Sequence, residues 1–274
     1  MRLAVVGHLE WVDFVDVERV PVAGEIIEGS PVLSVAAGGG AVAAVAFARW
    51  GAESLFFTSF GGDATGARAR TELAGRGVTI HALDRQLTPD RPQPQRRAIT
   101  FVDAQRERTI VVLGERHVVH ASDPLPWDEL ARCDAVYITG GDADAVRAAR
   151  AARVVVATSR VLPLLREAAI TIDALVGSAN DPRERYAAGD LDPAPRLVVR
   201  TDGARGGTFT LDGVEQRWAA VPAQVLGDTY GAGDTFAAGL TYALGEGLAA
   251  GEAIASAAAR AVEVLAVRGP YPSR

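Results

Sequence analysis

Short apolar runs alternate with helical patterns along most of this chain, and this alternation limits the possible folds more than any other feature. Each run has the length of one strand and is apolar at nearly every position, as in strands covered on both faces. These runs lie at 3–7, 54–59, 134–139, 153–158, 173–177 and 196–201. Helical spacing is found at 40–49, 64–75, 141–151, 161–168, 232–246 and 250–265. The order predicts an α/β fold with a mostly parallel sheet sandwiched by helices, and a ligand site beyond the carboxyl ends of the strands.

Two segments interrupt this alternation. Residues 11–35 and 96–113 alternate polar and apolar positions around polar turns at 21–25 and 103–107. Such patterns are typical of β-hairpins. We therefore expect a small β-stranded lid over the strand ends, within a single domain that covers 1–274. The stretch 87–95, rich in proline and glutamine, is expected to be an exposed connection.

The composition excludes several classes of protein. The 274 residues are 49% hydrophobic and 23% charged, which is typical of a folded chain with a large core. A net charge of −6 gives no electrostatic footprint for nucleic acid, and no apolar run is long enough to cross a bilayer. Cys133 is the only cysteine, which excludes an internal disulfide and a multi-cysteine metal site. These features favour a cytoplasmic protein without nucleic-acid or membrane partners.

Lysine is absent from this sequence, so that all 28 positions counted as lysine or arginine are arginine. The chain therefore cannot contain a Walker-type phosphate loop, the strand lysine of protein kinases or a pyridoxal Schiff base. Any phosphate group that this protein binds must be held by backbone amides, by arginine or by metal.

The stretch GDTYGAGDTFAAGL at 227–240 combines a glycine-rich turn with the start of a helix. The small residues Gly231, Ala232 and Gly233 leave the first amides of the helix open, which makes an anion hole that the helix dipole strengthens. Asp234 follows in the same turn, where it could accept a proton from a hydroxyl group or serve as an ordinary N-cap. We expect an unusual φ at Gly233, where a β-branched residue would be poorly tolerated.

This stretch resembles the D-T-x-G-A-G-D-x-F signature of the ribokinase-like (PfkB) family of carbohydrate kinases. Other parts of the chain resemble further family motifs in the same order: a P-x-P-G-E turn, a first glycine-rich motif, a G-x-D-x-x-G segment, a T-x-G-x-x-G nucleotide loop and a closing segment. They lie at 20–29, 36–51, 59–78, 201–207 and 266–273. The shared order favours the catalytic interpretation of Asp234 over an ordinary N-cap.

The resemblance implies an ATP-dependent phosphotransferase that moves the γ-phosphoryl group onto a hydroxyl of a sugar or related small molecule, with Mg²⁺ bridging the phosphates. It makes Asp234 the base and assigns the anion hole to the amides of Gly231, Ala232 and Gly233. The positions that it implies for nucleotide binding are Thr201, Gly203, Gly206, Asn180 and Glu184, and those for substrate binding are Asp13, Gly38 and Gly39. Arg106 and Arg108, in the second hairpin, are additional candidates to close over an anionic substrate.

The first glycine-rich motif departs from the family pattern. The family commonly has G-G-x-x-x-N, whose asparagine reaches a substrate hydroxyl, whereas Gly38 and Gly39 are followed at that offset by Ala43 and Ala44. A site without this donor and acceptor would prefer a different hydroxyl pattern or a more apolar group. This departure argues against ordinary ribose or fructose as the substrate.

The family's N-x-x-E motif, which organises metal-bound water and phosphate, is also altered. Asn180 is followed by Arg183 at the expected offset, and Glu184 stands one residue later. Asp181 is the other carboxylate available in this segment. We predict that Asn180 and Glu184 take the two roles.

The resemblance further implies a K⁺ site behind the anion hole. The two hairpins have too few strands for independent stability, so we expect them either to close over substrate or to pair with the hairpins of another subunit, and a homodimer through the lids is the working hypothesis. The positions that match the cation site are Asp228, Tyr230, Val264, Val267, Gly269 and Ser273. Among other polar residues, His8 and Glu10 follow the first strand and point towards the site. His117 and His120 have no third metal ligand nearby in the sequence and are expected at the surface.

Other functions remain open at this point. The alternatives are a nucleoside kinase of the same family and a degenerate, non-catalytic ligand-binding relative, which the two altered motifs favour. A hydroxymethylpyrimidine-type kinase is disfavoured by the two β-hairpins. A nucleotide-binding oxidoreductase is disfavoured because the G-x-G-x-x-G motif is missing after the first strand.

Overall fold

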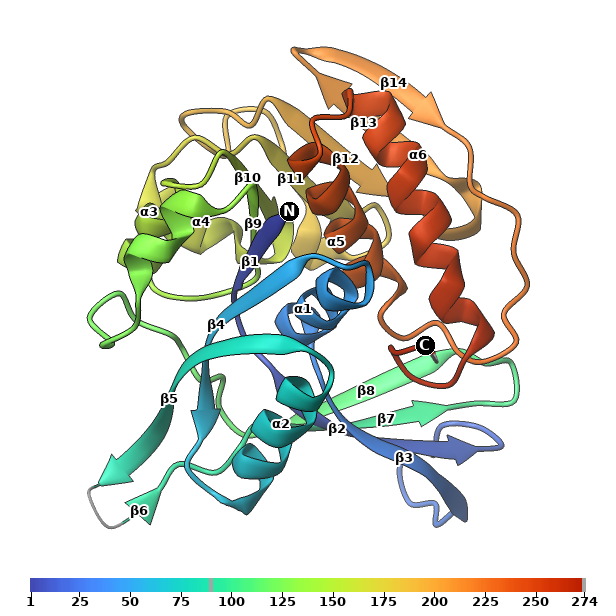
Figure 1. Cartoon of the computed structure of the whole chain (residues 1–274). Coiled ribbons are helices and arrows are strands. Elements are labelled where there is room, and N and C mark those ends of the chain that lie inside the picture. Colours follow the sequence, from blue (N-terminus) through green and yellow to red (C-terminus); the bar gives the residue numbers. More distant parts are fainter. Residues whose placement is uncertain (89–90, 273–274) are drawn as a thin grey trace.

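The computed structural model describes residues 1–88 and 91–272, and a mostly parallel sheet forms its centre (Figure 1). Within these residues the sheet has ten strands in the order β14-β13-β12-β11-β10-β9-β1-β4-β5-β6. The strands from β12 to β5 in this order are parallel, and β6, β13 and β14 are antiparallel. Their bounds are β1 Arg2–Val6, β4 Glu53–Gly61, β5 Val78–Thr88, β6 Arg91–Pro92, β9 Ala135–Ile138, β10 Val154–Thr158, β11 Ala174–Ser178, β12 Leu197–Thr201, β13 Gly207–Leu211 and β14 Val214–Trp218.

Helices cover both faces of this sheet (Figure 1). Side chains alternate along β1, so that Leu3 and Val5 pack with α1, α2, α5 and α6, whereas Ala4 and Val6 pack with α3 and α4. The α-helices are α1 Gly39–Arg49, α2 Ala64–Gly75, α3 Ala143–Ala149, α4 Leu162–Ala168, α5 Ala232–Gly245 and α6 Ala250–Ala261. The short 3₁₀ helices are η1 Trp127–Arg132, η2 Ser159–Val161, η3 Pro182–Glu184, η4 Gly203–Arg205 and η5 Val262–Ala266. The predicted fold class is confirmed.

A second, smaller sheet forms the lid. Its strands are β2 Glu10–Val17, β3 Gly29–Ala37, β7 Arg97–Val102 and β8 Arg108–Leu113, in the order β3-β2-β7-β8. Each of the two predicted hairpins is antiparallel, and a parallel pairing between β2 and β7 joins them. The two segments that interrupt the α/β alternation therefore meet in one sheet, which crosses below α1 and α5 in Figure 1.

Four strands of the main sheet lie outside the apolar runs of the sequence. These are β5, β6, β13 and β14, and most of their side chains are half-buried or exposed. A strand near a sheet edge has one face or side in water, so it needs no continuous apolar run. This is why the pattern that identified the central strands did not indicate these four.

The stretch 87–95 is more ordered than an exposed connection. Part of it forms β6, and Gln95 is only 3% exposed, with its side-chain oxygen accepting a hydrogen bond of 2.8 Å from Gly61 N. Positions 89–90 lie outside the described residues. The prediction of a plain surface loop is therefore wrong at Gln95, which ties this segment to the end of β4.

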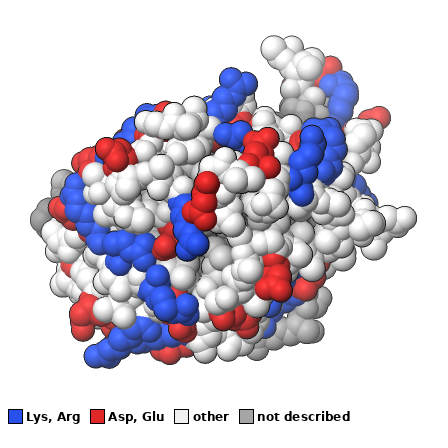
Figure 2. All heavy atoms as spheres, turned by 90° about the horizontal axis from the view of Figure 1, so that it is seen from above, with Lys and Arg blue, Asp and Glu red and all other residues white. Residues whose placement is uncertain are grey.

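The surface agrees with the net charge of −6. On the face shown in Figure 2, arginine and acidic side chains lie side by side, without one large basic area. Among the helices that the structure describes, none is both long and apolar enough to span a membrane.

Candidate active site

The turn 231–234, which we call the glycine turn, forms the beginning of α5. Gly231 is the N-cap, and its carbonyl oxygen accepts a hydrogen bond of 2.8 Å from Thr235 N. Within the described residues, the amides of Ala232, Gly233 and Asp234 have no acceptor, as expected for the first turn of a helix. A Cβ placed on Gly233 would meet no atom within 4 Å, so the turn faces open space. These amides can therefore receive an anion.

The unusual backbone angle lies at Gly231 instead of Gly233. Gly231 has a φ of 81°, and a Cβ there would come within 3.0 Å of Pro270. Gly233 belongs to the regular helix and does not have a positive φ. The prediction of an unusual φ at Gly233 is therefore wrong by two positions, because the positive φ belongs to the N-cap residue and Gly233 already has helical geometry.

The Asp234 carboxylate projects from the glycine turn towards the start of α1. A Cβ on Gly39 would lie 2.7 Å from Asp234 Oδ1 and 3.8 Å from Thr139 Cγ2. The neighbouring Gly38 has a φ of 84° and donates its amide to Tyr230 Oη at 3.3 Å. Gly38 and Gly39 thus provide bare backbone next to the carboxylate.

Two features leave the Asp234 carboxylate free to accept a proton: it has no hydrogen-bond partner among the described residues, and its pKa is raised. Asp234 forms no hydrogen bond or ion pair with any described residue, and Thr139 Oγ1 close by is buried without a partner. Burial, together with the negative charge of Glu184, raises the pKa of Asp234 to about 6. A carboxylate with this pKa is ionised at neutral pH and is more basic than an exposed aspartate.

The positions predicted to bind nucleotide gather at the carboxyl ends of β11 and β12. Thr201 ends β12, and its carbonyl oxygen accepts a hydrogen bond of 2.9 Å from Ala179 N. Asn180 Nδ2 donates to Asp202 Oδ1 at 3.0 Å. Gly203 has a φ of 55°, and a Cβ placed there would meet no atom within 4 Å, so this loop is open on one side. Gly206 closes the same loop with a φ of 82°.

Glu184 ends the short helix η3, and its charge acts on the pKa of Asp234. One of its oxygens accepts a hydrogen bond of 2.7 Å from Ser178 N, and the other is paired with Arg160 at 2.5 Å. Arg160 also donates to Asp181 Oδ2 at 2.7 Å. Arg160 follows β10 and has no recognisable motif around it, so the sequence pattern missed it.

Magnesium fits this site only as a partner of the nucleotide. Among residues 1–88 and 91–272, no three His, Cys, Asp or Glu side chains are grouped closely enough to hold a metal ion. Mg²⁺ is commonly held by one or two carboxylates together with substrate phosphates and water. Glu184 and Asp234 are the carboxylates available for such an arrangement.

Asp13 lies on the face of β2 that is turned away from the glycine turn. Its oxygens accept hydrogen bonds from Ser34 Oγ and from Arg97 Nη2, each at 2.6 Å. Its neighbour Phe14 points to the opposite face, where its ring centroid lies 4.9 Å from that of Tyr230. The structure therefore does not support Asp13 as a substrate contact. Side chains alternate between the two faces of a strand, so a prediction that is one residue out of register selects a side chain on the opposite face.

Glu10 begins β2 on the face opposite to that of Asp13, and His8 lies in the segment between β1 and β2. Glu10 is 8% exposed and pairs with Arg96 at 2.7 Å, and His8 Nδ1 lies 3.2 Å from Thr139 O. Burial, followed by the positive charge of Arg116, lowers the pKa of His8 to about 3 and keeps the ring neutral. Arg116 is half-buried and forms no ion pair or side-chain hydrogen bond with the described residues.

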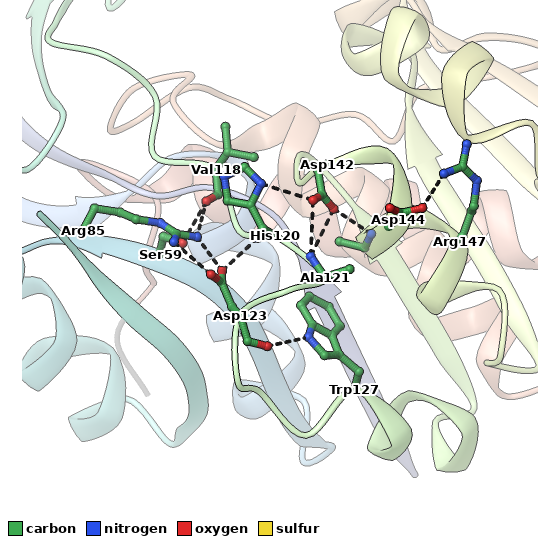
Figure 3. Close-up of polar contacts among 11 residues, drawn as sticks. Ser59, Arg85, Val118, His120, Ala121, Asp123, Trp127, Asp142, Asp144 and Arg147 are labelled. Carbon is green, nitrogen blue, oxygen red and sulfur yellow. Dashed lines mark hydrogen bonds and ion pairs between the residues drawn. The ribbon is translucent and has the colours of Figure 1, made fainter. Parts of the chain in front are cut away.

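A polar network fixes the loop that carries Arg116 (Figure 3). Arg85, near the end of β5, donates from Nη1 to Asp123 at 2.9 Å. His120 Nδ1 lies 3.1 Å from Asp142, the N-cap of α3. The loop is thus attached to elements on both sides of β1, which holds Arg116 near His8.

Of the two histidines of this loop, His117 differs from the surface position expected for it, whereas the side chain of His120 is 45% exposed. His117 is only 5% exposed, and its Nε2 lies 3.0 Å from Pro94 O. His120 is half-buried and contacts Asp142. Both hold the loop in place, which sequence spacing alone could not reveal.

Arg108 connects the lid to the loop before the glycine turn. Its Nη1 donates to Thr229 Oγ1, in the loop before the glycine turn, at 2.8 Å. Its charge is close enough to oppose the effect of burial on the pKa of Asp234. Arg106 lies in the exposed hairpin turn with a φ of 65°.

The positions predicted for K⁺ lie directly behind the glycine turn. Asp228 is fully buried there, and the loop that contains it packs against the closing segment of the chain. The set comprises Asp228, Tyr230, Val264, Val267, Gly269 and Ser273, the last of which lies outside the described residues.

Several solved structures share this fold over nearly the whole chain. Ribokinase from Thermotoga maritima has a TM-score of 0.78 at 18% identity, over 100% of this chain and 97% of its own. Ribokinase from Arabidopsis thaliana, solved with ribose and ATP, has a TM-score of 0.72 at 22% identity, over 98% and 93% of the two chains. Adenosine kinase from Sinorhizobium meliloti has a TM-score of 0.78 at 19% identity, over 99% and 95%. These matches confirm the ribokinase-like fold.

Sequence comparison identifies the family. No curated protein sequence matches this chain. The model of the pfkB family carbohydrate kinases, however, matches residues 1–171 and 171–274, which together span the sequence. This agrees with the order of the motifs and with the open amides beside Asp234. The chain therefore belongs to the pfkB family of carbohydrate kinases.

Proposed function

We propose that this protein transfers the γ-phosphoryl group of ATP to a hydroxyl of a small molecule, a sugar or a nucleoside, in the cytoplasm. The observation that carries the proposal is the Asp234 carboxylate, which has no partner among the described residues and lies beside three amides without acceptors. A hydroxyl hydrogen-bonded to Asp234 would face a phosphoryl group held by these amides. Positioning and charge neutralisation are the main demands of phosphoryl transfer, and a weak base is sufficient.

The nucleotide would lie along the ends of β11 and β12. Thr201, Gly203 and Gly206 would border it, and Asn180 would support the loop through Asp202. Mg²⁺ bound to the phosphates would supply charge neutralisation, with Glu184 as its nearest carboxylate. Because the chain has no lysine, positive charge near the transferred group would come from arginine, and Arg108 and Arg160 are the two arginines whose charges lower the pKa of Asp234.

The charges at the acceptor end favour a substrate with an anionic group. Arg116 is half-buried and has no ion-pair or side-chain hydrogen-bond partner among the described residues, whereas Arg96 is neutralised by Glu10. His8 stays neutral and can take part in hydrogen bonding without adding charge. A carboxylate or phosphate on the acceptor would satisfy Arg116, as arginine forms strong paired hydrogen bonds with both. We therefore propose a sugar acid, a sugar phosphate or a nucleotide-like alcohol as the acceptor.

ADP release across a panel of sugars, sugar acids, sugar phosphates and nucleosides tests this function. We expect turnover with at least one anionic acceptor. Replacing Arg116 with methionine should raise KM for that acceptor by about 10- to 100-fold, the value of a hydrogen bond to a charged group. Arg166→Met, which removes an exposed arginine paired with Asp190, is the matched control. ATP binding without ADP release for any acceptor would instead support the non-catalytic alternative.

We also propose that two chains associate through their lids. Strand β8 is at the edge of the lid sheet, and Ile110, Val111, Val112 and Leu113 are each 41–44% exposed. An apolar edge strand with unpaired backbone groups readily pairs with another strand. We expect a dimer in sedimentation velocity at micromolar concentration.

The double variant Ile110→Glu, Val112→Glu is expected to sediment as a monomer. Val214→Glu, on the exposed edge strand β14, is the control and should remain dimeric. A wild-type monomer at the same concentration would refute association through the lid.

A further inference from the structure

The region behind the glycine turn is built differently from a site for a bound monovalent cation. Asp228 is 0% exposed and accepts hydrogen bonds from Tyr230 N at 2.9 Å and Gly269 N at 2.7 Å. The carbonyl oxygens of Val264 and Val267 accept hydrogen bonds from Val267 N at 3.2 Å and Asp228 N at 3.1 Å. Of the groups predicted to coordinate K⁺, the Asp228 carboxylate and these two carbonyl oxygens thus already accept hydrogen bonds from the chain itself. As arranged here, these three groups do not fit K⁺ coordination.

A guanidinium group supplies positive charge at this place. Arg268 Nε lies 3.7 Å from Asp228 Oδ2, and Arg268 Nη2 is paired with Asp16 in lid strand β2. All three guanidinium nitrogens are buried, although 21% of the side chain is exposed. A fully buried carboxylate is costly unless a positive charge lies close to it. The protein therefore carries its own cation next to Asp228.

The closing segment holds this cation in a fixed position. A Cβ on Gly227 would lie only 1.7 Å from Val267 O, and one on Gly231 would lie 3.0 Å from Pro270. The chain on both sides of Arg268 therefore packs tightly against the two ends of the loop 227–231. The guanidinium and the glycine turn are positioned by the same contacts.

We infer that the Arg268 guanidinium takes the place of a bound monovalent cation behind the anion hole. Attached to the chain, it stabilises Asp228 and adds positive potential behind the open amides at any K⁺ concentration. Through Asp16, the same group joins the lid to the loop before the glycine turn. Arg268 is a positioning residue. Its expected effect on the reaction rate rests on the proposed function. Its role as the cation beside Asp228 is independent of that function.

Thermal unfolding tests the role as a cation without any knowledge of the acceptor. At fixed ionic strength, we expect the Tm of the wild-type protein to be the same in K⁺ and in tetramethylammonium. Arg268→Met should have a lower Tm, and K⁺ should restore part of the loss because a vacant cation position is then available. Arg268→Lys keeps the charge and should remain insensitive to K⁺. Arg166→Met controls for the loss of an arginine elsewhere.

Initial rates with ATP and an accepted substrate test the effect on catalysis. We expect the wild-type rate to be equal in the two salts. Arg268→Met should lower the rate by about tenfold or more, which is less than the effect of removing an anion-hole donor outright. K⁺ should recover part of this rate, and Arg268→Lys should retain most of it. If no acceptor is found, the unfolding experiment still decides the inference.

Two results would overturn the inference. The first is a wild-type protein whose Tm or rate rises specifically with K⁺, since this would mean that a free cation binds in addition to Arg268. The second is an Arg268→Met protein that behaves like Arg166→Met and does not respond to K⁺. If Arg268→Met does not fold, the wild type and Arg268→Lys decide the question. The inference is supported if both proteins fold and neither changes its Tm with K⁺. It is refuted if either protein requires K⁺.

Discussion

Asp234→Asn is expected to reduce turnover by about 10²- to 10⁴-fold, the usual contribution of a positioned general base. Asparagine has nearly the same shape but cannot accept the proton of the attacking hydroxyl. Because the side chain acts mainly in the transition state, ATP affinity should change little. Single-turnover kinetics and nucleotide titration measure the two effects. A variant with unchanged turnover would rule out Asp234 as the base.

The same variant is expected to be more stable than the wild type at neutral pH. Burial raises the pKa of Asp234 to about 6 in the folded protein, above the ordinary aspartate value of 3.8. The folded state therefore binds this proton more tightly than the unfolded state does. Proton binding stabilises the folded protein fully below pH 4, and this stabilisation is lost as the pH rises through about 6. Above that pH, Asp234→Asn should gain on the order of 1–3 kcal/mol.

Denaturant unfolding between pH 4 and 8 measures this difference. Asp212→Asn, which changes a carboxylate that is 62% exposed, is the control and should follow the wild type. Wild-type activity should rise as the pH rises through about 6, because the ionised carboxylate of Asp234 is the active form of the base. A difference between wild type and Asp234→Asn that does not depend on pH would contradict the raised pKa.

Gly39→Ala is expected to lower kcat by about 100-fold, because a displacement of about 1 Å at a reacting group can have an effect of this size. The added methyl group would lie 2.7 Å from Asp234 Oδ1, which is too close for both to stay in place. The carboxylate would have to turn away from the acceptor. Alanine at the start of α1 otherwise favours the helix over glycine by up to about 1 kcal/mol.

The comparison of kcat with stability separates displacement of the carboxylate from general damage. Gly75→Ala, in α2, is the matched control, because its Cβ would meet no atom within 4 Å and its φ is not positive. It should leave kcat unchanged. A Gly39→Ala protein with normal kcat, or one that loses activity only because it unfolds, would contradict the proposed position of Gly39.

The central fold could be predicted because periodicity reports burial. Strands covered on both faces need apolar residues throughout, and Leu3 to Val6 show this directly, with alternate residues in separate cores. Strand β14 escaped detection because nearly all of its side chains are exposed. The glycine turn could be predicted as an open helix start because bare backbone there requires small residues at fixed positions.

The remaining part of the site depends on distances in space. Asp13 contacts Ser34 and Arg97 on the face of β2 away from the glycine turn, and sequence spacing after a strand does not fix which face a side chain occupies. Arg160 and Arg116 were not identified because they come from separate loops and meet His8 and Asp234 only in the folded protein. Arg268 was overlooked for the same reason, because its two acidic partners are remote in the sequence.

The parallel pairing of β2 with β7 has a consequence for the order of folding. Parallel strands cannot be joined by a tight turn, and here the chain between them passes through α1, β4, α2 and β5. The two hairpins can each form locally, but their shared ladder must wait until that long loop has been closed by the central sheet. The lid therefore assembles late, and a nascent chain released before β7 is synthesised would expose one side of β2 to unwanted strand pairing.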